Sequence, residues 1–212
     1  MTTACLFLKA PRAGTVKTRL ARDIGADRAL AVYRALVERQ AAALPPAWSV
    51  VVSFAPHDAL EEMESWLRPR FPQGVRFEPQ CDGDLGDRLA SAVQREFLQC
   101  GATRLFLLGG DCPQITADYL HKAEASLETH DMAVGPAQDG GYVLLGLRSP
   151  LTALFENITW STPVVLAQTL AVAKHLSLSI ATLPTLEDVD NLESLERQNH
   201  AFLTHAAGLR KA

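Results

Sequence analysis

The sequence predicts a single α/β domain over residues 1–212, with a mostly parallel central sheet and helices on both of its faces. Short apolar segments typical of buried strands alternate along the chain with longer segments of helical periodicity. The length of 212 residues is ordinary for one such domain. Hydrophobic residues make up 48% and charged residues 21% of the chain, a globular balance that excludes wholesale disorder.

The first half of the chain predicts three strands and four helical segments. Residues 4–8 form a continuous apolar run typical of a buried strand, and a loop with Pro11 and Gly14 follows. Helical spacing then extends over residues 18–44, with a break expected near Gly25. The next expected elements are a strand at 50–54, a helix at 57–67, a strand at 75–77 and a helix marked by Leu85, Leu89, Val93 and Phe97.

The second half predicts four strands and three helices. Strands are expected at 105–108, 132–134, 142–147 and 178–183, with helices at 116–127, 161–176 and 191–206. Ser161 or Thr162 is the expected N-cap of the second helix, with Pro163 just inside it. Because ligands of such sheets bind beyond the carboxyl ends of the strands, we expect the chemistry in the loops after the first, fourth, sixth and last strands.

The overall charge excludes some functions. Lys plus Arg number 20 and Asp plus Glu number 24, so the net charge is −4 and the isoelectric point is about 5.9. This balance argues against a dedicated nucleic-acid-binding protein. No apolar run approaches the ~20 residues needed to span a membrane. The apolar run near the start is too short for a signal-peptide core, so we expect a cytoplasmic protein.

The loop after the first strand concentrates positive charge in an acidic chain. It lies between a buried strand and the start of a helix, where free N–H groups and the helix dipole favour anions. A phosphate chain is the expected ligand, although a solvated basic loop would also explain the composition. The expected phosphate-binding residues are Lys9, Arg12, Gly14, Lys17, Thr18 and Arg19.

Three aspartates follow expected strands. Asp111 ends a central strand, where an unpaired carboxylate is costly to bury and a divalent cation would compensate it. Asp188 and Asp190 lie two residues apart, so they share a face in an extended segment. We expect Asp111 and Asp190 to hold Mg²⁺ or Mn²⁺, with Asp188 as the alternative to Asp190. Helix capping by these aspartates is the competing interpretation.

Three further motifs offer candidates for binding. Gly86 and Arg88 open an expected helix and could contact the nucleotide, although a plain helix cap explains much of that pattern. A glycine-rich turn and a nearby tryptophan are candidates for acceptor binding, although the turn also has hairpin composition and such a tryptophan often serves packing. These acceptor candidates are Gly140, Gly141, Tyr142 and Trp160, with Asp139 beside them as a candidate base.

Together these motifs resemble those of the nucleotide-diphospho-sugar transferase superfamily, with its Rossmann-like GT-A-type fold. Within it the chain is similar to small bacterial transferases found beside radical-SAM and selenium-related proteins, which are glycosyltransferase-like and include arsenosugar-type members. The first loop also resembles that of 2-phospholactate guanylyltransferases and, more distantly, of molybdenum-cofactor guanylyltransferases. The resemblance implies that Lys17 and Arg19 contact phosphates and that Asp111 binds Mg²⁺. This chain departs in having only Gly14 in the loop and Gly-Gly-Asp-Cys-Pro where glycosyltransferases carry D-x-D.

The leading hypothesis is metal-dependent glycosyl transfer from a nucleotide-sugar donor to a small-molecule acceptor. Asp111, Asp139 and Lys17 are the expected catalytic residues, acting on the cation, the acceptor hydroxyl and the departing diphosphate respectively. The alternative is nucleotidyl transfer, in which a substrate phosphate attacks a nucleoside triphosphate and pyrophosphate leaves. A nucleotide-binding module without catalysis, or an α/β domain without a nucleotide site, are the remaining hypotheses. Glycosyl or nucleotidyl transfer by either route makes the protein a transferase.

Overall fold

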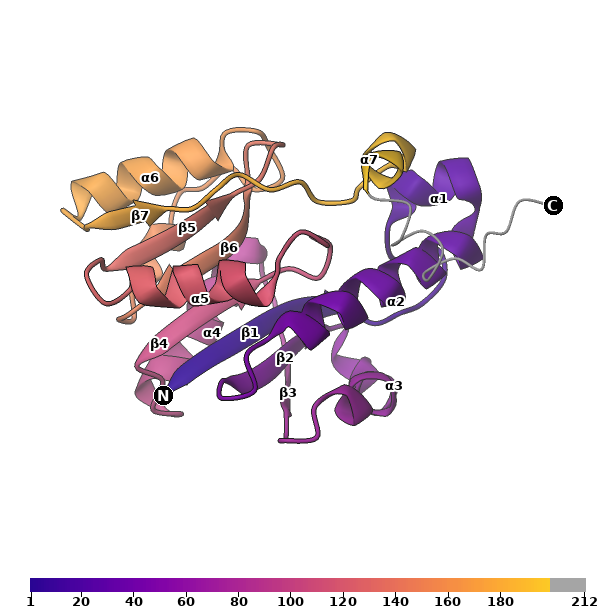
Figure 1. Cartoon of the computed structure of the whole chain (residues 1–212), viewed down its shortest axis with the longest axis horizontal. Coiled ribbons are helices and arrows are strands. Elements are labelled where there is room, and N and C mark those ends of the chain that lie inside the picture. The colour runs from indigo at the N-terminus through magenta and orange to yellow at the C-terminus, as the bar shows by residue number, and fades with distance from the viewer. Residues whose placement is uncertain (199–212) are drawn as a thin grey trace.

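The computed structural model describes residues 1–198 and contains one seven-stranded sheet (Figure 1). The strand order is β3-β2-β1-β4-β6-β5-β7. Strand β6 is antiparallel to both of its neighbours, and the other adjacent pairs are parallel. The expected mostly parallel α/β fold is therefore confirmed. The strands are β1 (Thr2–Lys9), β2 (Ser49–Ala55), β3 (Arg76–Pro79), β4 (Arg104–Leu108), β5 (Met132–Pro136), β6 (Tyr142–Leu147) and β7 (Ile180–Thr182).

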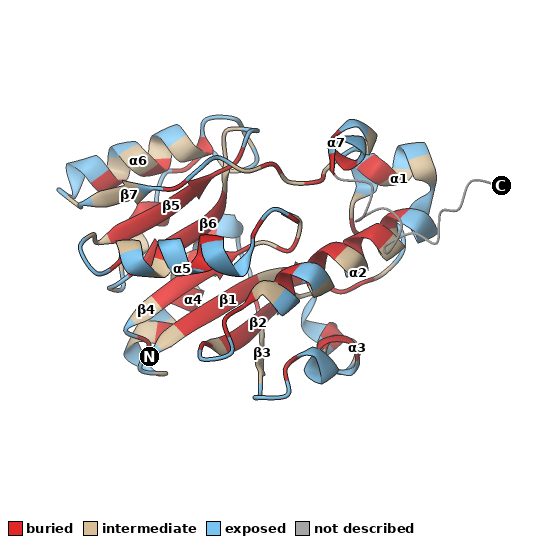
Figure 2. Ribbon diagram, in the orientation of Figure 1, coloured by how far each residue is buried: buried red, intermediate tan, exposed pale blue. Residues whose placement is uncertain are grey.

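Helices cover both faces of the sheet, and the strands between them are largely buried (Figure 2). One apolar core lies between the sheet and helices α2, α3 and α5, and a second lies between the opposite face and α4 and α6. A third, smaller core joins α1, α2 and α7 beyond the sheet. The helices are α1 (Thr18–Ile24), α2 (Ala26–Ala43), α3 (Leu60–Leu67), α4 (Leu85–Leu98), α5 (Ala117–Ser126), α6 (Val165–His175) and α7 (Leu192–Arg197).

The break expected in the first long helical segment is confirmed at Gly25. Its φ of 87° lies in a region that glycine adopts without the steric cost of a side chain. The residue ends α1 and begins α2, so the two helices run in different directions (Figure 1). This turn brings α1, and with it the end of the first loop, against the C-terminal helix α7.

The loop that directly follows the sixth strand does not start at the expected edge of the sheet, so that part of the prediction is wrong. Because β6 is antiparallel to β4, its carboxyl end lies at the opposite edge of the sheet from the carboxyl end of β4. The turn at residues 137–141, which joins β5 to β6 as a hairpin, lies at the expected edge instead. The segment after β6 contributes Trp160 to a hollow that the turn residues Asp139 and Gly141 also line.

The helix expected at 161–176 begins four residues later than predicted, and its expected cap is wrong. Ser161 has a φ of 62°, in the left-handed region that no right-handed helix uses. The Thr162 hydroxyl donates to the Thr159 carbonyl oxygen at 2.6 Å rather than capping the helix. Val164 is the observed N-cap, and no side-chain hydrogen bond caps it.

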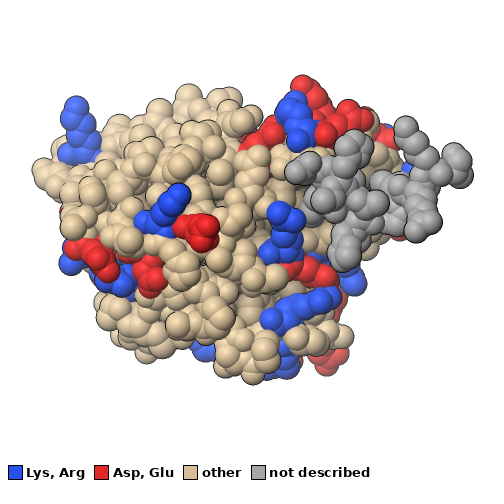
Figure 3. All heavy atoms as spheres, in the orientation of Figure 1, with Lys and Arg blue, Asp and Glu red and all other residues tan. Residues whose placement is uncertain are grey.

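The last expected helix is represented by α7, which ends at Arg197; the part of that prediction from residue 199 onward lies outside the described residues. Among the described helices, none combines the length and apolar composition needed to cross a membrane. On the face shown in Figure 3, the lysines and arginines of the described part are interspersed with carboxylates.

Candidate functional site

Three chain segments converge at one edge of the sheet. Strands β1 and β4 are parallel neighbours, so the loop after β1 and the Gly109–Asp111 segment after β4 leave the sheet side by side. The segment after β7 joins them, because the Val189 N–H donates to the Asp111 carbonyl oxygen at 3.0 Å. These three segments carry the principal charged candidates, Lys17, Asp111 and Asp190.

Lys17 lies at the centre of this group. Its ammonium nitrogen is 3.0 Å from Asp111 Oδ2 and 3.0 Å from Asp190 Oδ1, and its side chain is only 7% exposed. Burial alone lowers the pKa of Lys17, but the charges of Asp111 and Asp190 and the hydrogen bonds to them outweigh it and raise the pKa above its ordinary value. A solvated basic loop therefore does not describe this lysine.

Lys17 also has an unusual backbone. It is the N-cap of α1 with φ 45° and ψ 46°, a left-handed conformation that costs a non-glycine residue free energy. The conformation directs the side chain into the carboxylates rather than into solvent. Such local strain persists only where surrounding contacts hold it, and here the two ion pairs supply those contacts.

Asp111, Asp188 and Asp190 form one carboxylate cluster. Each offers an oxygen atom, and these atoms lie within 4.8 Å of one another. Burial raises the pKa of Asp188 to about 6, and the negative charges of Asp111, Asp190 and Asp139 add to this. Three hard oxygen donors suit Mg²⁺ or Mn²⁺, and the ammonium of Lys17 shows that the cluster accommodates positive charge.

The two aspartates after β7 share a face because the residue between them is buried. Val189 is 0% exposed and packs with α1, α2 and α7, so Asp188 and Asp190 both turn toward the opposite side, where Asp111 lies. Sequence reasoning left open which of the two joins Asp111. The structure brings both of them to it.

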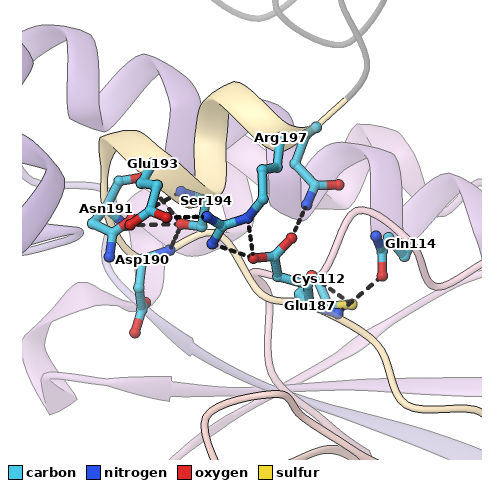
Figure 4. A network of polar contacts seen from close by, with 9 residues as sticks. Cys112, Gln114, Glu187, Asp190, Asn191, Glu193, Ser194 and Arg197 are labelled. Carbon is cyan, nitrogen blue, oxygen red and sulfur yellow. Dashed lines mark hydrogen bonds and ion pairs between the residues drawn. The ribbon is translucent and has the colours of Figure 1, made fainter.

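A polar network fixes this segment from behind (Figure 4). Arg197 of α7 donates from Nε to Glu187 Oε1 at 2.8 Å, and the Glu187 side chain is only 9% exposed. The Cys112 thiol donates to the Glu187 carbonyl oxygen, which joins the network to the chain after β4. In Figure 4 the Asp190 side chain points away from this network, so its carboxylate stays available to Lys17.

None of the three aspartates caps a helix. Asn191 is the N-cap of α7 and accepts from the Ser194 N–H at 2.8 Å. Thr116 is the N-cap of α5 and accepts from the Tyr119 N–H. The competing capping interpretation is therefore wrong, and the Asp111, Asp188 and Asp190 side chains need another explanation.

Two hollows on either side of Asp111 open onto this cluster. The first, which we call the basic hollow, has a volume of about 300 Å³ and lies between the first loop and Asp111. It is lined, among others, by Lys9, Lys17, Thr18, Arg19, Asp111 and Asp190. The second, the apolar hollow, has a volume of about 290 Å³ and is lined by Phe7, Leu85, Leu89, Asp111, Asp139 and Asp188 among others.

A third hollow of about 490 Å³ adjoins them and contains the tryptophan predicted from the sequence. Trp160 lines it together with Arg19, Asp139 and Gly141. Tyr142 also lines it, but the Tyr142 hydroxyl is buried toward Thr169 of α6, away from the carboxylates. Tyr142 can therefore offer its ring to a ligand in this hollow.

Arg12 and Arg88 lie apart from the carboxylates, in an outer hollow of about 440 Å³ beyond β1 and β2. Arg12 pairs with Asp58 at 3.4 Å and with Glu62 at 2.9 Å, so its charge is already partly neutralised. Arg88 donates to the Gln80 side-chain oxygen at 3.3 Å. Lys9 and Thr15 line both this hollow and the basic hollow, and Lys9 is the one charged residue that they share.

Three predicted glycines have structural tasks. A β-carbon on Gly86 would lie 2.7 Å from the Trp160 ring nitrogen, so Gly86 lets α4 pack against that residue. A β-carbon on Gly140 would lie 2.1 Å from the Pro163 carbonyl oxygen. Gly14 has a φ of 80° with open space around it, so it serves the turn of the loop. None of these contacts involves the carboxylate cluster.

Sequence reasoning missed the apolar floor of the site. Phe7 is part of β1, and Leu85 is the first residue of α4, with 42% of its surface exposed. In the sequence Leu85 belongs to the same apolar helical pattern as Leu89, Val93 and Phe97, and only the structure shows that it is exposed rather than packed in the core. Phe7 also carried no signal, since its neighbours in the strand are buried residues of the same kind.

The chain has relatives among known protein families and solved structures. Residues 36–162 match the family described as "Uncharacterized protein conserved in bacteria (DUF2064)". No curated protein matches the sequence. A Desulfovibrio desulfuricans G20 protein, provisionally named a nucleotide-diphospho-sugar transferase, is 32% identical over 96% of this chain and 94% of its own, with a TM-score of 0.87.

Two more distant structures share the fold. The inositol-1-phosphate CTP transferase of T. maritima is 13% identical over 100% of this chain and 98% of its own, with a TM-score of 0.61. A Mycobacterium tuberculosis H37Rv protein in complex with manganese is 15% identical over 92% of this chain and 96% of its own, with a TM-score of 0.51. These similarities confirm the fold class that the sequence predicts.

Proposed function

The chain belongs to the DUF2064 family and to the family of the D. desulfuricans protein, within the nucleotide-diphospho-sugar transferase superfamily, and from this premise we propose a metal-dependent glycosyltransferase. The expected superfamily and the broad class, a nucleotide-using transferase, are confirmed by these relationships. The observation that carries the finer proposal is the carboxylate cluster with Lys17 inside it, between a basic and an apolar hollow.

The donor's phosphates bind in the basic hollow. Lys9, Lys17 and Arg19 line it, and the N-terminus of α1 adds free N–H groups. Asp111, Asp188 and Asp190 would hold a divalent cation, which neutralises charge that develops on the departing diphosphate. Lys17 adds a fixed positive charge next to that position.

The acceptor enters from the other side of Asp111. Its hydroxyl oxygen forms a bond to the anomeric carbon, while the bond from that carbon to the diphosphate oxygen breaks and the nucleoside diphosphate leaves with the electron pair. Asp139 takes the hydroxyl proton, because it lines both the apolar hollow and the hollow of Trp160. The Gly141 N–H donates to Asp139 Oδ1 at 2.9 Å and orients that carboxylate.

Nucleotidyl transfer is the second candidate, and the length of the basic surface favours it. The cations extend from Arg19 through Lys17 to Lys9, and Lys9 also lines the outer hollow. A nucleoside triphosphate could follow this path, with a substrate phosphate attacking the α-phosphorus and pyrophosphate leaving. The same carboxylates would serve this reaction.

A two-step experiment tests the proposal. Thermal unfolding is measured with nucleoside triphosphates and nucleotide sugars, each with and without Mg²⁺ or Mn²⁺; a ligand at ~100 times its dissociation constant adds roughly 2.7 kcal/mol of stability. The best donor is then incubated with a pool of small alcohols, sugars and sugar phosphates. Release of nucleoside diphosphate supports glycosyl transfer, whereas pyrophosphate from a triphosphate supports the second candidate and contradicts the first.

Matched variants locate the effect. Asp190→Asn removes one charge from the carboxylate cluster and should abolish the metal-dependent part of the donor's stabilisation. Asp118→Asn removes an exposed charge from the first turn of α5 and should leave that stabilisation unchanged. Equal effects of the two variants would show that the carboxylate cluster is not part of the donor site.

A further inference from the structure

The apolar hollow differs in chemistry from the basic hollow, although Asp111 borders both. Hydrophobic side chains make up most of its wall, including Phe7, Leu85, Leu89 and Val143. Its polar side chains include three carboxylates, Asp111, Asp139 and Asp188. Among the described residues, no lysine, arginine or histidine lines it.

This charge distribution excludes anions from the apolar hollow. The carboxylates of Asp111, Asp139, Asp188 and Asp190 carry four negative charges when ionised. A divalent cation, Lys17 and Arg19, which lies 3.5 Å from Asp190, would offset these charges from the side of the basic hollow and of the Trp160 hollow, and a bound donor would add the negative charges of its own phosphates. A phosphate or carboxylate group entering the apolar hollow would therefore face the carboxylates of its wall and no cationic side chain among the residues that line it.

The size and lining of the apolar hollow also favour a ligand with an apolar group. At about 290 Å³ it has room for one aromatic ring or a short aliphatic chain. Leu85 is 42% exposed and Phe7 is partly buried, so a ligand there would cover apolar surface that the fold itself leaves open. The carboxylate of Asp139 lies at the same hollow to receive a hydroxyl proton.

We infer that the apolar hollow binds the acceptor, and that this acceptor is an uncharged or cationic alcohol with an apolar body rather than a phosphorylated or carboxylated compound. The inference rests on the proposed function in taking this hollow as the acceptor side. It goes beyond that function by assigning the acceptor's charge and hydrophobic character. It also runs against the second candidate reaction, whose acceptor carries a phosphate.

Three probes that share a benzyl group and differ in charge test this inference on the protein without a donor. Benzyl alcohol, benzylamine and benzyl phosphate are titrated with and without Mg²⁺, and binding in the apolar hollow is measured by the NMR shift changes of the Leu89 methyl groups, because Leu89 lines the apolar hollow and not the basic hollow where phosphates are proposed to bind. Benzyl alcohol and benzylamine should each bind at least about threefold more tightly than benzyl phosphate. No donor is needed, so the outcome is independent of the nucleotide screen and the two proposals can fail separately.

A pair of variants on one helix locates the binding. Leu85→Lys introduces a cation at an exposed rim position and should strengthen benzyl phosphate binding at least about threefold. Leu98→Lys places the same charge at the other end of α4, where Leu98 is 64% exposed, and should change nothing.

Several results would overturn the inference. These are tighter binding of benzyl phosphate than of benzyl alcohol by the unmodified protein, no binding of any probe, or equal effects of the two lysine variants. Retained folding of both variants is checked by their thermal unfolding, and the exposure of both positions makes them tolerant of the change.

Discussion

The substitution Lys17→Met separates the structural role of this lysine from its role toward ligands. Methionine keeps the length of the side chain and the left-handed backbone that any non-glycine residue must adopt there. It removes the ammonium that lies 3.0 Å from Asp111 and 3.0 Å from Asp190. The carboxylate cluster is then left without its internal cation.

The expected loss of stability follows from two opposing effects. At 3.0 Å and an effective dielectric constant of ~20, the Coulomb attraction of each ion pair before desolvation is about 5.5 kcal/mol. Desolvating an ammonium that is 7% exposed offsets several kcal/mol of this. Asp111 and Asp190 stay 37% and 38% exposed, so solvent screens them further, and we expect a net loss of about 2 kcal/mol.

The same substitution should strengthen the binding of a metal ion in the absence of nucleotide. Lys17 competes with a divalent cation for Asp111 and Asp190, so the affinity for Mn²⁺ should rise at least about tenfold, or 1.4 kcal/mol. Free Mn²⁺ is measured by electron paramagnetic resonance, and stability by chemical denaturation with and without Mn²⁺. Donor affinity should fall in the same variant, because a phosphate contact is lost.

The control is Lys174→Met, which removes an exposed lysine in the last turn of α6. It should alter neither stability nor Mn²⁺ affinity. If Lys17→Met leaves Mn²⁺ affinity unchanged or weakens it, then Lys17 does not occupy the place of the cation and the reasoning is wrong.

Three other predictions concern the frame around the site. Gly140→Ala should lower stability by more than about 2 kcal/mol, because its β-carbon would lie 2.1 Å from the Pro163 carbonyl oxygen at a φ of 90°; a loss below about 0.5 kcal/mol in urea unfolding would contradict this contact. Hydrogen bonds from Ser179 lower the pKa of Asp131, so Asp131→Ala should cost up to about 1 kcal/mol near neutral pH. Because the folded pKa is the lower one, that difference should be full above the unfolded pKa of about 4 and disappear as the pH falls through the folded value; a constant difference in acid would refute the assignment. Arg197→Met should weaken Mn²⁺ binding severalfold without changing any carboxylate, since it releases the segment that carries two of the three carboxylates. An unchanged Mn²⁺ affinity, measured by electron paramagnetic resonance, would show that the Arg197–Glu187 network is not needed to position the carboxylate cluster.

The fold was predictable because its signals are local. Most strands contain a short apolar run, with β3 (Arg-Phe-Glu-Pro) as an exception, and Gly25 divides two helices as its conformational freedom allows. The error at β6 has a non-local cause. Its residues did not indicate that β6 is antiparallel to β4, because strand direction depends on which neighbour a strand pairs with and not on its own residues.

The candidate site was predictable in part. Asp188 and Asp190 share a face because they alternate with a buried valine, a period-two pattern visible in the sequence. Arg12 was expected beside Lys17, but it turns to Asp58 and Glu62 instead. The sequence of such a loop shows which residues are charged, whereas the partners that orient each charged side chain come from other elements.

The sequence by itself determined the order of the strands and helices, the basic first loop and the three aspartates that follow strands. Only the tertiary structure decided that Lys17 lies within the carboxylates, since its partners are 94 and 173 residues away along the chain. It also decided that the two sides of Asp111 differ, one cationic and one apolar. The physical reason is that propensity and periodicity act over a few residues, whereas an electrostatic site depends on distances that only the order and direction of the strands set.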